Sequence, residues 1–241
     1  MSQLLITIGF IAVFVFVPGI REFYCTNIRY DGVVGHCLSA SQNGFIVYIV
    51  SYIIFFITYF AIACCESVRR KSPGNMIAMA IFTLSLSVWV SSIAIYHDVY
   101  WVFMAIGITA ALCLGLTLFS FQTKIDFTGW GIYLFAASWI LFLFGILAIV
   151  FFAKGYPVVH TGTYRCLTMI FAKIFFLPII LFSVYSALVA ILFSGFLIYD
   201  TQQIMGGKKY EISPEEHVYA SIQLYIDVVY IFLAILNLGR R

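Results

Sequence analysis

The stretch that decides the fold is residues 199–227, "YDTQQIMGGKKYEISPEEHVYASIQLYID", which joins the end of one apolar run to the first half of the next. Two aspartates mark it. Asp200 ends the first run, and Asp227 lies inside the second, in a predicted helix over 219–238. An aspartate in the middle of a membrane helix costs about 3 kcal/mol on insertion scales, so Asp227 must face protein or water rather than lipid.

The composition identifies the class of protein. Of the 241 residues, 63% are hydrophobic and 10% are charged, and the mean hydropathy is +1.06. Soluble domains carry about 25% charged residues. The chain is therefore predicted to be an integral membrane protein in contact with the lipid bilayer, and its dispersed net charge of +3 argues against a nucleic-acid partner.

Seven apolar runs are long enough to cross roughly 30 Å of hydrocarbon. The first is short, but no basic segment precedes it and no small-residue cleavage site follows, so we expect a helix rather than a signal peptide. The linkers are short, which predicts an all-α membrane protein, a seven-transmembrane-helix bundle forming a single polytopic domain over residues 1–241. The predicted helices cover residues 4–18, 45–64, 76–96, 99–120, 129–152, 179–199 and 219–238.

Lysine and arginine in short loops set the orientation of a membrane protein. They divide almost evenly between the two sides of this chain. The clusters at 69–71 and 208–209, with Lys124, lie directly against helix ends. We therefore expect these loops, and with them the amino terminus, to be cytosolic.

The last predicted helix has a clear start signal, because residues 213–216, "SPEE", fit a cap, a first turn and a capping box. In that register a polar stripe runs down the helix through Asp227. For Gln223, Tyr230 and Asn237 we expect hydrogen bonds that hold helices together. For Asp227 we favour an ion or proton site.

Gly206 and Gly207 let the chain reverse, so the last two helices are predicted to pack side by side and bring Asp200 near Asp227. Two acids in a poorly solvated site cannot both be ionised cheaply, so such a pair titrates in coupled steps and can sense pH. The same oxygens attract a hard cation such as Ca²⁺, bound transiently. Arg69 or Arg70, at the end of the second helix, is an alternative partner for one of the acids.

Signals for an enzyme are missing from the sequence: no catalytic triad order, phosphate-binding glycine loop or zinc spacing is present. We expect no enzymatic activity and no tightly bound cofactor. Cys25 and Cys37 share one predicted loop on the far side, where both a disulfide and two free thiols are compatible with the sequence.

Four motifs occur in order along the chain: "CCESVRRKSPGN", "FQTKIDFT", "YDTQQIMGG" and "ISPEEHVYASIQLYIDVVYIFLAIL". In these motifs the chain resembles the transmembrane BAX-inhibitor-motif family, lifeguard branch. The resemblance implies a seven-helix fold with the C-terminal helix central. It also implies a pH-sensitive calcium leak in endoplasmic reticulum or Golgi membranes that lowers luminal calcium and suppresses cell death.

The resemblance also implies roles for particular residues. The family's di-aspartyl sensor falls on Asp200 and Asp227. An arginine that bridges to the sensor when the pore is closed falls on Arg69 or Arg70, and an acid of the pore falls on Glu215.

Three features depart from the family pattern. A proline- and glycine-rich cytosolic tail is missing, and with it the partners that bind such a tail. The loop at 21–44 carries extra residues, including both of its cysteines. An insertion covers 154–177, in which the apolar part at 167–177 is interrupted by Lys173, so we expect a lumenal or interfacial helix there rather than an eighth span.

The sequence therefore favours a calcium leak gated by the two aspartates, with calcium ions as the permeant species. One alternative is a non-conducting scaffold that binds death-pathway or calcium-channel membrane proteins. A second is a proton/calcium antiporter that uses the same acids. A seven-helix receptor agrees with the helix count alone.

Overall fold

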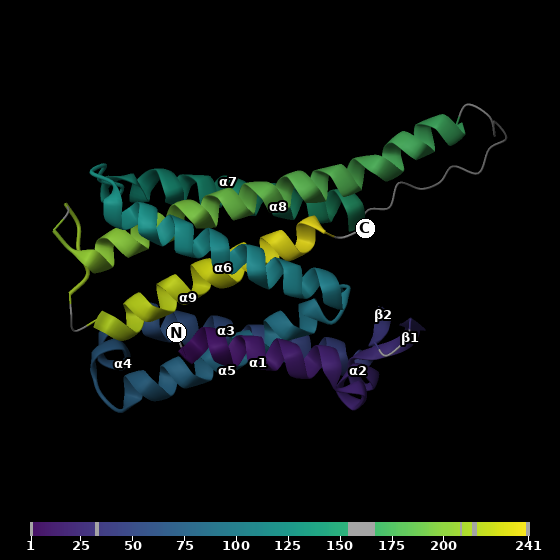
Figure 1. Ribbon diagram of the computed structural model, residues 1–241, viewed down its shortest axis with the longest axis horizontal. Coiled ribbons are helices and arrows are strands. Elements are labelled where there is room, and N and C mark those ends of the chain that lie inside the picture. Colours follow the sequence, from purple (N-terminus) through teal and green to yellow (C-terminus); the bar gives the residue numbers. More distant parts are fainter. Residues whose placement is uncertain (1, 32–33, 154–166, 208, 214–215, 240–241) are drawn as a thin grey trace.

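The computed structural model describes residues 2–31, 34–153, 167–207, 209–213 and 216–239. Long helices run roughly side by side, and a small β-hairpin lies at one end of them (Figure 1). The elements are α1 Ser2–Phe16, α2 Pro18–Tyr24, β1 Cys25–Asp31, β2 Val34–Ala40, α3 Gln42–Cys64, α4 Glu66–Arg70, α5 Gly74–Ala94, α6 Val99–Gln122, η1 Thr128–Trp130, α7 Gly131–Ala153, α8 Leu167–Met205 and α9 His217–Leu238.

The prediction of an all-α membrane bundle is confirmed. In the described residues, six helices are long and apolar enough to cross a membrane, and the α1–α2 pair makes a seventh if it counts as one span. That pair is bent by 83°, so α2 runs across the end of α1. Each predicted span lies on one of these helices, because an apolar run of membrane length has to satisfy its backbone groups internally.

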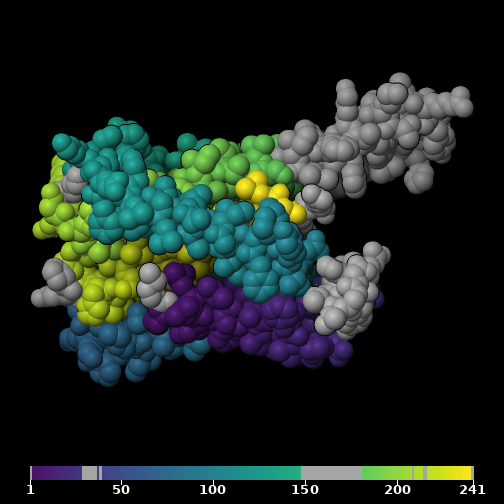
Figure 2. Space-filling model, viewed as in Figure 1, coloured from purple at the N-terminus to yellow at the C-terminus, as the bar shows by residue number. Residues whose placement is uncertain are grey.

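The C-terminal helix is central, as expected. The most apolar window of α9 is 61% buried, whereas that of α7 is 0% buried. In Figure 1, α9 runs between the α6–α7–α8 side and the α1–α3–α5 side, and in Figure 2 the chain segments around it hide most of its surface. α5, α6 and α8 pack directly on α9, whereas α1 and α3 pack on α5, and α7 packs on α8.

The insertion differs from the prediction. Residues 167–177 are helical and add no eighth span among the described residues, as predicted, but they are not a separate helix, because they are the start of α8, which has 39 residues and ends at Met205. A helix of that length measures about 58 Å, almost twice the hydrocarbon thickness. The membrane-length part is Leu181–Met205, and the first turns of α8 project beyond the bundle (Figure 1). Residues 154–166 of the insertion lie outside the described residues.

The loop at 21–44 also differs, since it contains an antiparallel pair of strands, β1 and β2. Cys25 and Cys37 form a disulfide across the pair, with Cα atoms 5.6 Å apart, which decides between the bonded and free thiols. Gly44 allows the end of α2 to lie against the start of α3, because a Cβ there would lie 2.8 Å from the Cα of Tyr24.

The start of the last helix differs from the predicted capping box. α9 begins at His217, and the residue before it, Glu216, makes no capping hydrogen bond with its side chain. The amide of Glu216 instead closes a turn on the carbonyl of Ser213. Gly206 and Gly207 have φ angles of 71° and 72°, so the chain does reverse at the predicted glycines.

A buried hydrogen-bond network joins α1, α5 and α9. Thr7 Oγ1 lies 2.6 Å from the hydroxyl of Tyr225 and 3.0 Å from Ser87 Oγ. One turn earlier on α1, Gln3 Nε2 donates to Thr83 Oγ1. Ser87 also donates to the carbonyl of Thr83, so each hydroxyl in this network has a partner. We call these five residues the threonine–tyrosine network.

Candidate functional site

Asp200 on α8 and Asp227 on α9 lie together inside the bundle, each with only 3% of its surface exposed. Both residues line the same cavity from neighbouring helices. Carboxylates only accept hydrogen bonds, so two carboxyl groups bond to each other only when one carries a proton. The arrangement therefore places two groups that can share a proton on neighbouring helices.

Part of this site has no partner within the part of the chain that the structure describes. Asp200 Oδ1, Asp227 Oδ2 and Gln223 Oε1 are buried and form no hydrogen bond with any described residue. Leaving such an acceptor unpaired costs about 1–3 kcal/mol. All three atoms are oxygens, so the group that would satisfy them has to donate hydrogen bonds or carry positive charge. We refer to the three residues as the acceptor triad.

The triad lines a cavity of about 670 Å³ between α3, α7, α8 and α9. More than half of the residues around it are aromatic, and they include Tyr52, Phe55, Trp139 and Phe193. Its volume lies within the roughly 300–1,000 Å³ typical of small-molecule sites. We call this space the aromatic cavity.

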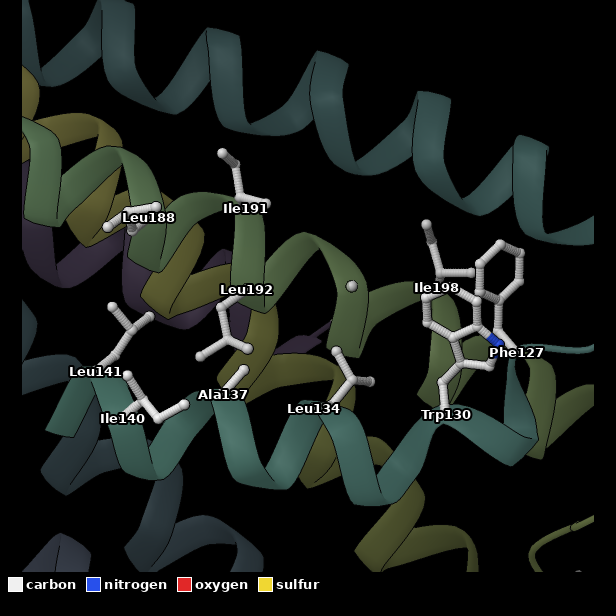
Figure 3. Close-up of a pocket in the computed structure, with 11 residues that line it drawn as sticks. Phe127, Trp130, Leu134, Ala137, Ile140, Leu141, Leu188, Ile191, Leu192 and Ile198 are labelled. Atoms are coloured by element: carbon white, nitrogen blue, oxygen red, sulfur yellow. The ribbon is translucent and has the colours of Figure 1, made fainter.

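A second cavity gives a useful contrast. It has a volume of about 440 Å³ and lies between α7 and α8, where apolar side chains from both helices converge (Figure 3). Among the described residues that line it, none is charged. This groove can hold hydrocarbon, but it offers nothing to an ion.

The arginines at the end of α4 do not reach the acids in this structure. Among the described residues, Arg69 and Arg70 form their ion pairs to α9 with Glu216, each at 2.9 Å. Arg70 also pairs with Glu66, and the Arg69 guanidinium lies over the ring of Tyr219. In this structure the two arginines thus form a clamp on Glu216, directly before α9, and the bridge to Asp200 or Asp227 stays a prediction.

The clamp shows what the sequence reasoning missed. Glu215 was the expected pore acid, but it lies outside the described residues, and its neighbour Glu216 holds both arginines. A signal was present, because an acid at a helix start opposite two arginines is a common pairing. The motif contains two adjacent acids, Glu215 and Glu216, and the sequence alone does not show which of them pairs with the arginines.

Gln202 is a structural position in residues 199–227 that sequence reasoning did not single out. Its side chain is fully buried; Oε1 accepts from the amide of Phe127, and Nε2 donates to the carbonyl of Ile125. These bonds fasten the α6–α7 loop to α8 two residues after Asp200. The loop motif and the aspartate motif are therefore parts of one structure.

The polar residues predicted to form a stripe on α9 make different kinds of contact. Gln223 belongs to the acceptor triad, and the ring of Tyr230 stacks on Phe193 with centroids 4.5 Å apart. Asn237 donates to the carbonyl of Leu233 on its own helix. The predicted bond between helices is therefore wrong for Asn237, because the carbonyl four residues earlier competes for its amide.

A resident metal does not fit the site. Among the described residues, no three histidines, cysteines or acids gather closely enough to hold an ion. Ca²⁺ takes about 6–8 oxygen ligands. The acceptor triad supplies only part of such a shell.

Comparisons with known proteins agree with this architecture. The family model described as inhibitor of apoptosis-promoting Bax1 matches residues 1–164 and 158–239. Protein lifeguard 3 of Mus musculus is 36% identical over 240 residues, which cover 99% of this chain and 65% of that protein. Protein lifeguard 3 of Homo sapiens is 34% identical over 236 residues, covering 98% and 64% respectively.

A third relative, protein lifeguard 4 of Mus musculus, is 38% identical over 169 residues, which cover 70% of this chain and 59% of that protein. The chain therefore spans just under two thirds of the length of the relatives it matches.

Proposed function

The chain belongs to the BAX-inhibitor-motif family, in its lifeguard branch, and from that premise we propose that it is a calcium-permeable leak regulated by protonation of Asp200 and Asp227. One observation carries the proposal. Two acids are buried in the same cavity inside the bundle, and each has a carboxyl oxygen that no described residue satisfies. Ionisable groups inside a membrane protein mark ion or proton pathways by default.

Protonation supplies the proposed gate. When the two acids share a proton, their negative charge is reduced and the arginines remain with Glu216, which is the arrangement described above. When the proton leaves, two carboxylates attract an arginine from the clamp, which draws α4 towards the acids and closes the cytosolic mouth. Protonation therefore favours the leak, and deprotonation favours the closed state.

The compartment and orientation are part of the proposal. The Cys25–Cys37 disulfide lies at the end of the bundle opposite α4, and disulfides persist in oxidising compartments (Figure 1). This supports a lumenal hairpin, a cytosolic amino terminus and residence in the endoplasmic reticulum or Golgi membrane. We propose no enzymatic activity and no bound cofactor.

Suppression of cell death is the proposed outcome of the leak, because it lowers the calcium held in the lumen. The matched family is described as an inhibitor of apoptosis-promoting Bax1, which supports a role in apoptosis for this chain. Death-pathway or calcium-channel membrane proteins are the partners that fit this role.

The experiment is calcium flux into dye-loaded proteoliposomes from about pH 6 to about pH 8. Wild type is compared with Asp200→Asn, Asp227→Asn and the control Tyr225→Phe, which removes a buried polar group two residues from Asp227. We expect the wild-type and control leaks to rise as pH falls, and the asparagine variants to lose this dependence.

Each other outcome has a definite meaning. Equal flux in wild type and Asp227→Asn across the pH range contradicts the proposed gate. Folded protein that passes no calcium points to the scaffold. Calcium movement against its gradient, driven by a proton gradient, points to the antiporter.

A further inference from the structure

The aromatic cavity has two chemically distinct parts. Its inner end carries the acceptor triad, and its walls are rings from α3, α7, α8 and α9. A hydrated calcium ion would use the inner end alone. The walls therefore need a separate explanation, which the proposed leak does not supply.

The inner end is complementary to a donor with positive charge. Asp200 and Asp227 are each 97% buried, and both have an oxygen without a partner. Gln223 adds a third unpaired acceptor. A neutral alcohol brings one donor to these three oxygens, whereas an alkylammonium group brings up to three donors and a full positive charge.

The walls are complementary to the rest of such a molecule. Rings of Tyr59, Phe193 and Tyr230 line the cavity near the acids. Aromatic faces attract ammonium groups when they lie within about 6 Å, and they also bury hydrocarbon. A small inorganic ion gains little from these walls because it keeps its water.

The outer rim indicates where a ligand enters. Tyr52 and Phe56 on α3 and Trp139 and Phe142 on α7 line the cavity and are 39–56% exposed. α3 packs mainly on α5, and α7 packs mainly on α8, so this side lies between two packed pairs of helices. Both helices are membrane spans, so the rim faces the lipid phase.

We infer that the aromatic cavity binds an amphipathic amine that enters from the bilayer, with its ammonium group on the acceptor triad and its hydrocarbon chain against the aromatic walls. The occupant is a lipophilic primary or secondary amine. The inference goes beyond calcium movement and does not depend on it, because binding requires only the triad and the walls.

The test uses two bromine-tagged probes that differ only in the head group, ω-bromoundecylamine and ω-bromoundecanol. Bromine quenches tryptophan fluorescence on contact, and Trp139 lies in the cavity wall. The protein is placed in phosphatidylcholine nanodiscs and titrated with each probe. Phe variants at Trp139 and at Trp130, which lines the apolar groove in Figure 3, assign the signal to one cavity.

We expect saturable quenching by the amine with an apparent affinity at least about tenfold above that of the alcohol. Trp139→Phe should remove this difference, and Trp130→Phe should keep it. Asp200→Asn combined with Asp227→Asn should reduce the affinity for the amine to that for the alcohol. Gln223→Leu, which keeps both acids, should weaken amine binding by a smaller factor and provides a second variant if the double variant does not fold.

Equal quenching by amine and alcohol in wild type would overturn the inference, since it would mean that both probes only partition into the lipid. An amine preference that survives in the folded double asparagine variant would overturn it as well. The result is independent of the flux experiment: a protein that conducts calcium without preferring the amine loses this inference alone.

Discussion

Two sets of polar side chains lie inside the same apolar bundle, and they differ in how their hydrogen bonds are satisfied. In the threonine–tyrosine network, each hydroxyl has a partner on another helix or on the backbone. In the acceptor triad, three oxygens have none. Both sets include residues of α9. One set stabilises the bundle, and the other has unpaired oxygens that can bind a ligand, proton or ion.

The difference teaches how to separate structure from function in a membrane protein. In a satisfied network, hydrogen bonds within the protein compensate for the free energy that is lost when polar groups leave water. An unsatisfied one does not, and an unsatisfied site persists when binding a ligand, proton or ion compensates for it. Removing a polar group from the threonine–tyrosine network should therefore lower the free energy of unfolding. Removing one from the acceptor triad should leave it unchanged or raise it.

The largest effect is expected from Asp200→Asn combined with Asp227→Asn. Asparagine removes the negative charge and brings amide donors to oxygens that have no partner among the described residues, so the free energy of unfolding should rise by about 1–3 kcal/mol. Thermal unfolding in detergent measures the change. A clear loss of stability would show that the acids hold the bundle together, and the contrast between the two sets would disappear.

A smaller effect of opposite sign is expected from Tyr225→Phe. The hydroxyl of Tyr225 is shared with Thr7 at 2.6 Å, so its removal should lower the free energy of unfolding by about 1 kcal/mol. Combining it with Thr7→Val in a double-mutant cycle isolates the pair. Strictly additive losses would mean that α1 and α9 are not coupled through this bond.

Two glutamines offer a matched test in which the chemical change is the same. Gln3 Nε2 donates to Thr83, whereas Gln223 Oε1 has no partner. Gln3→Leu should therefore lower stability by about 0.6 kcal/mol, the average for polar contacts between membrane helices. Gln223→Leu should leave stability unchanged or raise it, and equal losses at both positions would contradict the comparison.

The smallest effect on stability is expected at the arginine clamp, which belongs to neither set. The side chains of Arg69 and Glu216 are 19% and 16% exposed, so water and salt screen their attraction. Glu216→Gln should lower the free energy of unfolding by about 0.5 kcal/mol, and the loss should shrink in high salt. If the loss in free energy of unfolding did not depend on salt, the clamp would be shielded from solvent in the same way as the threonine–tyrosine network.

The sequence predicted the spans well and the polar interior unevenly. An acid in an apolar run is conspicuous, so the proximity of Asp200 and Asp227 followed from the glycine turn between their helices. Thr7 and Ser87 gave no comparable signal, because hydroxyls in membrane helices can bond to the carbonyl of their own preceding turn. Nothing in the order of residues shows which hydroxyl reaches another helix.

The continuous α8 and the β-hairpin also differ from the prediction. In both cases the local sequence pattern does not determine which distant residues a segment packs against. Lys173 suggested a break in the apolar insertion, yet α8 continues through it. The hairpin was not predicted, although β1 and β2 are two short strands close together in the sequence. Because most of the chain consists of apolar runs of membrane length, only helices were predicted.

The length of α8 has a mechanical consequence. Its 39 residues form one helix that measures about 58 Å, and Asp200 lies near its C-terminal end. The first turns of this helix project beyond the bundle (Figure 1). Because the helix is continuous, a torque applied to the projecting turns would rotate Asp200 relative to Asp227. The projecting turns are thus a lever through which a force from outside the bundle would reach the buried acids.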